Sequence, residues 1–159
     1  MASMRDIKRR KGSIQSTQQI TKAMKLVSTV KLQKARNRAE QSNPYFNHMY
    51  QTVTSMLARS GSLNHPYLKA IITIASNRGL AGGYNSNIVK LVTSSGIAVE
   101  DAQIYMIGRK AKEQLMRRGY EIKADYSDVI EGPTYEDALT IFKEVLESFS
   151  KGEIGEIYL

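Results

Sequence analysis

The residues best placed to do chemistry form a glycine-rich stretch, Ser76–Asn85, with the sequence Ser-Asn-Arg-Gly-Leu-Ala-Gly-Gly-Tyr-Asn. It lies between a predicted strand and a predicted helix, where phosphate-binding loops occur. It lacks the Lys-Ser/Thr pair of a Walker P-loop, and its glycines do not fit the pattern G-x-G-x-x-G. A tight turn that needs positive φ and close packing explains the same composition. We therefore expect Gly79, Gly82 and Gly83 to be structural, and we expect no nucleotide cofactor.

Other groups capable of chemistry are sparse. The chain has no cysteine and two isolated histidines, His48 and His65, so the sequence offers no thiol nucleophile, no Cys-ligated metal and no histidine cluster. Glu144 and Glu147 are three residues apart, which is ordinary patterning for an exposed helix face. We expect no catalytic residue, no metal site and no enzymatic activity of the chain by itself.

The basic charge is concentrated in one segment. The formal net charge is +8, but residues 1–58 hold eleven Lys and Arg against two acidic residues, and residues 59–159 hold twelve against thirteen. The run Lys8–Lys11 suits a nucleic acid or an acidic protein groove. No aromatic residue precedes Tyr45, although aromatic side chains are what stack on bases in single-stranded nucleic acids. A basic coiled-coil protein that binds nucleic acid is the alternative function.

The basic segment is predicted to be one long helix over residues 1–59, because helix-forming residues dominate it. Seam positions recur every three or four residues, which is typical of a coiled coil: Ile14, Thr17, Thr21, Met24, Ser28, Leu32, Ala35, Ala39 and Ser42, continued by Phe46, Met49, Val53 and Met56. The small residues among them would let a partner helix approach closely. About 54 helical residues span roughly 80 Å, which the rest of the chain cannot bury.

Two features of this helix leave alternatives open. Ser42-Asn43-Pro44 suits an N-cap followed by proline at the first helical position, which would begin a second helix, but a proline-kinked continuous helix keeps the seam in register. The stretch Ile20–Val30 is apolar on most sides, so it is either extra core in an ordinary bundle or a part of the helix enclosed by several partner subunits.

Residues 66–159 alternate predicted strands and helices. Strands are expected at 70–75, 102–107, 120–124 and 155–159, and helices at 85–95, 110–118 and 134–150, the last one opened by Thr134 with Asp137 three positions on. This alternation predicts an α/β fold: a Rossmann-like domain with a mainly parallel sheet covered on both faces. The final apolar strand is expected to be incomplete, which suggests a truncated domain. The longest uncharged apolar run is far below the ~20 residues of a membrane span.

Three stretches of the sequence resemble the gamma subunit of F-type ATP synthase. The first is Asp6-Ile7 with Ser13–Ser28, extended by Lys31–Ala35, which is similar to the family's N-terminal signature. The second is His65-Pro66-Tyr67, and the third is Ser76–Asn85, similar to the family's loop S-x-R-G-L-x-G-x-x-N. The match corresponds to the family's N-terminal half, and the lack of a cysteine-bearing insertion and of a transit peptide favours the bacterial type.

The resemblance implies a rotor shaft without chemistry of its own. In the family, the N-terminal helix pairs antiparallel with a C-terminal helix of the same chain, which is absent here, inside a ring of alpha and beta subunits. The α/β domain contacts the epsilon subunit and the membrane ring of c subunits. Ion flow turns this central stalk and drives the beta sites through their states. The expected location is the cytoplasmic face of the bacterial cell membrane, as a peripheral protein, and the coupling ion is set by the membrane ring.

The resemblance also implies a surface that faces the stator. Lys22, Met24 and Lys25 match positions where the family's helix passes the acidic lever loops of the beta subunits. Arg78 and Lys90 match basic positions that face the same levers. Two departures stand out, since Lys11 replaces a usual aliphatic residue and Asn77 replaces a common Asp, which would leave Arg78 with one fewer anionic neighbour.

Overall fold

The N-terminal part of the protein is a single helix. In the computed structural model, residues 3–57 and 68–159 are described, and the chain forms two compact units, Met1–Gly61 and Ser62–Leu159. Helix α1 spans Met4–Leu57, a length of 54 residues. The long N-terminal helix predicted from the sequence is therefore confirmed. His65, Pro66 and Tyr67 lie outside the described residues.

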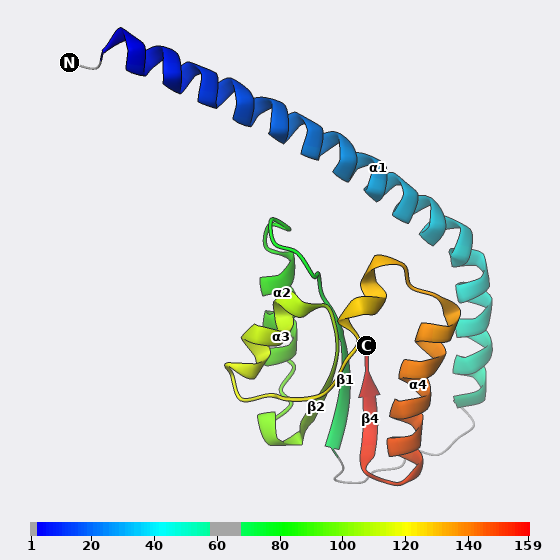
Figure 1. The fold of residues 1–159 in the computed structure, drawn as a ribbon. Coiled ribbons are helices and arrows are strands. Elements are labelled where there is room, and N and C mark those ends of the chain that lie inside the picture. The colour runs from blue at the N-terminus through cyan, green and yellow to red at the C-terminus, as the bar shows by residue number, and fades with distance from the viewer. Residues whose placement is uncertain (1–2, 58–67) are drawn as a thin grey trace. The chain divides into compact units, whose positions relative to one another are not determined.

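Helix α1 is continuous through Pro44. The Oγ of Ser42 donates a hydrogen bond to the carbonyl of Arg38 at 2.7 Å, one turn back in the same helix. Because proline has no N–H, the carbonyl of Glu40 loses its helical partner. Figure 1 shows α1 bending within its cyan part, the part of the colour range that contains Pro44. The structure thus has the kinked continuous helix, and not a second helix that begins at this proline.

The second unit alternates strands and helices along a parallel sheet. Its elements are β1 (Leu68–Ile74), α2 (Tyr84–Thr93), β2 (Ala102–Ile107), α3 (Arg109–Met116), β3 (Glu121–Asp125), α4 (Tyr135–Ser150) and β4 (Ile154–Tyr158), with short 3-10 helices at Val99–Asp101 and Ser127–Glu131. The strand order is β3-β2-β1-β4, and each neighbouring pair is parallel. The predicted α/β class with a parallel sheet is confirmed.

Helices cover both faces of this sheet. Figure 1 shows α2 and α3 on one side of the strands and α4 on the other. Alternate residues of each strand point to opposite faces, so Ile71 of β1 joins a core with α2 and α3, whereas Ala70 and Ile72 join a core that includes Val145 of α4. The core is therefore divided into two layers by the sheet.

Local sequence signals set the ends of the helices. Gly119 follows α3 with φ of +87° and Gly152 follows α4 with φ of +74°, a conformation that favours glycine after a helix. Thr134 and Asp137 form a capping box at the start of α4, with each side chain bonded to the other residue's backbone N–H. The sequence thus correctly predicted the ends of α3 and α4 at Gly119 and Gly152 and the start of α4 at Thr134.

Gly108 lets two loops approach each other at the end of the sheet. It follows β2, has φ of +111°, and a Cβ on it would lie 2.1 Å from the carbonyl oxygen of Ala75. The backbone N–H of Ala75 donates to the carbonyl of Ile107 at 2.7 Å. The segments that follow β1 and β2 are thus in backbone contact, and only glycine fits between them.

We expect Gly108→Ala to destabilise the protein by about 4 kcal/mol or more, because it combines backbone strain with a backbone clash. Gly79→Ala is the matched control, since no atom lies within 4 Å of its Cβ position and its φ is ordinary. Urea unfolding of both variants measures the difference. Equal midpoints for the two variants would show that the loops after β1 and β2 can move apart at little cost.

Candidate functional site

Hydrogen bonds from its two end residues close the glycine-rich loop. The backbone N–H of Ser76 donates to Oδ1 of Asn85 at 3.0 Å, and the Ser76 hydroxyl lies 2.9 Å from the same oxygen. The hydroxyl is also 2.7 Å from the carbonyl of Arg78. The first and last polar residues of the motif therefore bond to each other across the loop.

Backbone conformation inside the loop is specialised at two positions. Gly82 has φ of +56° and Leu80 has φ of +62°, and only the glycine adopts this region without strain. Around Gly79 and Gly82 the space is open, whereas a Cβ on Gly83 would contact the side chain of Asn87. The loop is thus a tight turn at the surface.

Asn77 connects the loop to two other segments. Its Nδ2 donates to the carbonyl of Ser127 at 2.7 Å, and its Oδ1 accepts from the backbone N–H of Arg109 at 3.0 Å. An aspartate at this position accepts the second bond but cannot donate the first. The asparagine therefore ties together the segments that follow β1, β2 and β3.

Two ion pairs lie beside Asn77 and line a polar cavity of about 360 Å³. Arg78 contacts Glu131 at 3.1 Å, with side chains 78% and 68% exposed, and Arg109 contacts Asp128 at 2.8 Å. Arg78 thus has an anionic neighbour from another segment although Asn77 is uncharged. Such exposed pairs contribute about 0–1 kcal/mol each, so either arginine can change partners at low cost.

Sequence reasoning identified Arg78 in this cluster but missed Arg109, Asp128 and Glu131. No local motif marks these three residues. One signal was available, since each follows a strand of a parallel sheet, and the carboxyl ends of such strands meet at one edge. The topology of a parallel sheet could therefore have predicted this cluster, whereas a search for local motifs could not.

Asp125, the last residue of β3, is a further carboxylate at this edge. Burial acts to raise its pKa, but hydrogen bonds from Lys112 and from Ser127 outweigh that effect and hold the pKa below the ordinary value of 3.8. The Nζ of Lys112 lies 2.7 Å from Oδ2 of Asp125, and both side chains are about one-third exposed. This pair joins α3 to the end of β3.

Lys22, Met24 and Lys25 lie in the first half of α1 and are exposed, with 53% of Met24 accessible to solvent. Across residues 3–57 and 68–159, no carboxylate lies within 4 Å of Lys22, Lys25 or Lys90. Lys90 lies on α2, in the unit that contains Arg78.

The seam of α1 is uncovered in this chain. Every predicted seam residue is exposed: Ile14, Thr17, Thr21, Ser28, Leu32, Ala35, Ala39 and Ser42. The hydroxyls of Thr17 and Thr21 donate to carbonyls one turn back, at 3.0 and 2.9 Å. The hydroxyls of Thr17, Thr21 and Ser42 along this seam therefore have partners within α1 itself and require none from another helix.

Residues 3–57 and 68–159 contain neither a membrane-spanning helix nor a candidate metal site. No helix there combines the length and the apolar character needed to cross a membrane. No group of three or more His, Asp or Glu side chains in the same ranges could hold a metal ion.

The structure thus defines an α/β protein that carries a long helix with an uncovered apolar seam. A family model described as ATP synthase matches residues 3–159, and the chain belongs to that family. It is similar to the ATP synthase gamma chain of Lachnoclostridium phytofermentans, with 66% identity over 100% of this chain and 57% of the relative. The resemblance to gamma subunits found in the sequence is therefore confirmed.

Other gamma chains match over the same extent. The ATP synthase gamma chain of Alkaliphilus metalliredigens is 36% identical over 98% of this chain and 56% of its own length. The sodium ion specific gamma chain of Acetobacterium woodii is 35% identical over 99% of this chain and 54% of its own length. The chain thus spans somewhat more than half the length of these curated relatives.

We expect Asn77→Ala to lower the free energy of unfolding by about 1–3 kcal/mol, because it leaves the carbonyl of Ser127 and the N–H of Arg109 without these partners. Asn87→Ala is the control, since Asn87 is an exposed residue of α2 in the same unit. Chemical denaturation followed by circular dichroism compares the two variants. A loss for Asn87→Ala as large as that for Asn77→Ala would contradict the role of Asn77 as the link between three segments.

We expect stability to fall in acid partly through Asp125. Its folded-state pKa lies below the value of 3.8, so its contribution is present above that pH and is lost as the pH falls through the folded pKa. The unfolding free energy of Asp125→Asn should therefore change less between about pH 5 and pH 2 than that of the wild type. Asp101→Asn, which removes an exposed carboxylate, controls for net charge. Identical pH profiles for the wild type and Asp125→Asn would exclude this linkage.

Proposed function

We propose that the protein is a central-stalk rotor subunit of a bacterial F-type ATP synthase. The observation that carries the proposal is α1, a helix of 54 residues whose seam is uncovered in this chain, in a sequence similar to gamma chains along its whole length. A helix of this length and composition requires partner surfaces, because exposed apolar side chains at coiled-coil spacing favour association.

The partners follow from the same features. Residues 1–59 form one strand of an antiparallel coiled-coil shaft, and the second strand comes from the part of the relatives' length that this chain does not span. The shaft turns inside a ring of alpha and beta subunits, and residues 66–159 contact the epsilon subunit and the membrane c-ring. The protein is peripheral, at the cytoplasmic face of the cell membrane.

The role of the protein in this assembly is mechanical. Ion flow through the membrane ring turns the shaft, and the shaft imposes conformational changes on the catalytic beta subunits. The polar groups of the glycine-rich loop are bonded to one another and to neighbouring segments, which supports a structural loop and not a phosphate cradle. The chain supplies no catalytic group and takes no cofactor.

Lys22, Met24 and Lys25 are proposed to face the stator. The two lysines have no carboxylate partner within the described residues, so their charge is available to acidic groups of a neighbouring subunit. Met24 lies between them in the sequence, and its flexible thioether packs against varied surfaces without a strong directional bond. This combination suits a surface that passes several partners in turn.

Arg78 and Lys90 are proposed to face the same acidic levers from the α/β unit. The pair between Arg78 and Glu131 is exposed on both sides, so its net energy is small and a partner carboxylate can replace Glu131. Lys90 lies on the exposed side of α2, next to the buried Val89. Weak, exchangeable contacts are what a rotating surface needs.

The test is Met24→Lys in the assembled synthase. The substitution adds a third cation to the sequence between Lys22 and Lys25, and a new charge-assisted bond to a stator carboxylate of about 1–3 kcal/mol would hold one rotor angle. We expect ATP hydrolysis to continue while ion transport per ATP falls. Measurements on membrane vesicles, with Met24→Leu as the uncharged control, compare the two activities.

Unchanged transport per ATP in Met24→Lys would contradict the stator-facing position of this residue. Loss of transport in Met24→Leu to the same degree would point to packing and not to charge. Failure of the chain to co-purify with alpha and beta subunits would contradict the rotor function itself.

A further inference from the structure

The polar cavity beside Asn77 holds two arginines whose ion-pair partners come from one short acidic segment. Arg78 follows β1 and pairs with Glu131, whereas Arg109 follows β2 and pairs with Asp128. Both carboxylates belong to the 3-10 helix Ser127–Glu131, and all four charged side chains line the same cavity. A single segment of the chain therefore pairs with both arginines.

The spacing of the two carboxylates explains how one segment reaches two arginines. Asp128 and Glu131 are three residues apart, and side chains at this spacing in a 3-10 helix lie on the same side. The start of the segment is fixed at Ser127, whose carbonyl accepts from Nδ2 of Asn77 at 2.7 Å and whose hydroxyl accepts from the N–H of Gly108 at 3.3 Å. The segment thus presents two carboxylates on one helical turn, as an acidic ligand would.

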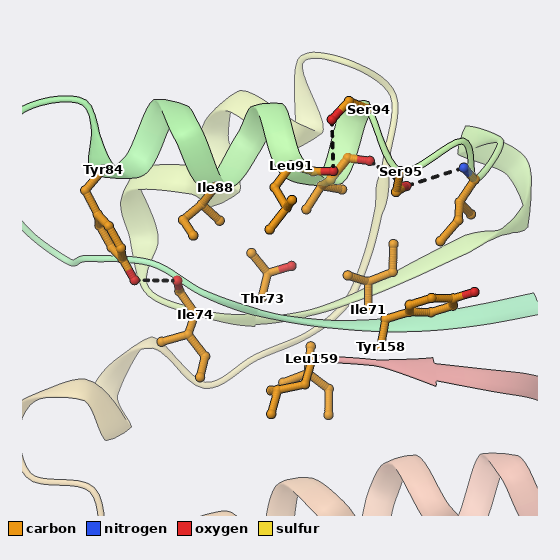
Figure 2. Close-up of a pocket in the computed structure, with 13 residues that line it drawn as sticks. Ile71, Thr73, Ile74, Tyr84, Ile88, Leu91, Ser94, Ser95, Tyr158 and Leu159 are labelled. Carbon is orange, nitrogen blue, oxygen red and sulfur yellow. Dashed lines mark hydrogen bonds between the residues drawn. The ribbon is translucent and has the colours of Figure 1, made fainter. Parts of the chain in front are cut away.

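The backbone that carries the two arginines is also fixed. Near the end of the glycine-rich loop, Figure 2 shows the hydroxyl of Tyr84 donating to the carbonyl of Ile74, the last residue of β1, and this distance is 3.0 Å. The backbone N–H of Arg109, at the start of α3, donates to Oδ1 of Asn77. The guanidinium groups of Arg78 and Arg109 therefore extend from a preorganised backbone, which lowers the entropic cost of binding a partner.

The two ion pairs themselves are open to exchange. The side chains of Arg109 and Asp128 are 64% and 93% exposed, and the pair of Arg78 with Glu131 is exposed to a similar degree. Exposed pairs of this kind are weak, because water competes for both charges. A guanidinium offers the same planar set of donors to any carboxylate, so a carboxylate from another protein regains what the broken pair loses.

We propose that Arg78 and Arg109 form one docking site for an acidic protein segment with two carboxylates on one helical turn, and that Asp128 and Glu131 compete for this site from within the chain. The partner's carboxylates take the positions of these two side chains, which turn toward solvent. The occupant is thus identified by the segment that the arginines already bind.

The backbone of α3 favours carboxylates over a phosphate as the occupant. A phosphate at the start of a helix binds to backbone N–H groups there. At the start of α3, however, the N–H of Arg109 donates to Asn77 and the N–H of Lys110 donates to the carbonyl of Ser76 at 3.0 Å. These two donors are already used, so recognition depends on the guanidinium side chains.

The inference deepens the proposed function and rests on it for Arg78 as a contact to acidic groups of a neighbouring subunit. It adds Arg109 as a second contact, and it assigns Asp128 and Glu131 a role in limiting affinity. Because every partner must displace these two carboxylates, binding stays weak enough to be exchanged.

The test measures binding of a fluorescein-labelled helical peptide, rich in Ala and Gln, that carries two glutamates three residues apart. The variant Asp128→Asn with Glu131→Gln removes the internal competitor. In fluorescence anisotropy at about 0.1 M salt, we expect it to bind the peptide at least ~5-fold more tightly than the wild-type chain, because two weak pairs no longer have to be broken. A peptide with glutamines in place of the two glutamates should show no such gain.

Glu100→Gln with Asp101→Asn is the matched control for net charge. Both residues are exposed and lie in the 3-10 helix before β2, whereas Arg109 follows β2. We expect this control to bind the glutamate peptide about as weakly as the wild type, because salt screens distant charges. Within the variant that lacks Asp128 and Glu131, Arg78→Gln and Arg109→Gln should each remove the gain in affinity.

Three results would overturn the inference. The first is an equal affinity of the neutralised variant and the Glu100/Asp101 control, including no binding by either. The second is a gain that survives Arg109→Gln. The third is tighter binding of a single-stranded oligonucleotide than of the glutamate peptide by the neutralised variant, which would assign the site to nucleic acid. If the double substitution impairs folding, Glu131→Gln alone should show a smaller gain that Arg78→Gln removes, and no gain would equally overturn the inference. All of these results leave the rotor function standing, because that function is tested by co-purification and by transport in the assembled synthase.

Discussion

A helix of 54 residues that carries an apolar seam cannot cover that seam by itself, and the organisation of this protein follows from that constraint. In α1 the seam residues are exposed from Ile14 to Met56. Their seryl and threonyl hydroxyls are bonded largely within the helix, as Thr17, Thr21 and Ser42 show. What remains for a partner is therefore apolar contact, which is not directional. Such a surface permits close association without fixing one set of polar bonds.

The α/β unit has the opposite character at the carboxyl edge of its sheet, because there the bonds are numerous and specific. Asn77 links the segments after β1, β2 and β3, and Gly108 permits the backbone approach that brings them together. In related open sheets this edge is where ligands bind. Here its backbone groups are bonded to the protein itself, so the edge forms a rigid end of the unit. Arg78 and Arg109 extend from this rigid end, in exposed ion pairs.

The basic side chains of this protein combine a fixed backbone with weak ion pairing. The hydrogen bonds of Ser76 and Asn77 hold the backbone at Arg78 in place. The exposed ion pair between the Arg78 side chain and Glu131, by contrast, costs little to break. The lysines of α1 have no carboxylate partner within the described residues. The backbone that carries these basic residues is thus fixed by secondary structure and hydrogen bonds, whereas their charged side chains make only weak contacts. That distribution of energies suits surfaces that exchange partners, as the proposed rotor requires.

The sequence by itself determined the elements of this protein, because their signals are local. The spacing of the seam predicted α1, β-branched runs predicted the strands, and Gly119, Thr134 and Gly152 marked the ends of helices. Only the tertiary structure decided that α1 continues through Pro44, since the local pattern allowed either a new helix or a kink. It also decided the strand order, the partners of Asn77, and the pairing of Arg78 with Glu131 and of Arg109 with Asp128. These features depend on residues that are distant in the chain and that meet only when parallel strands end at a common edge, so no short stretch of sequence contains them.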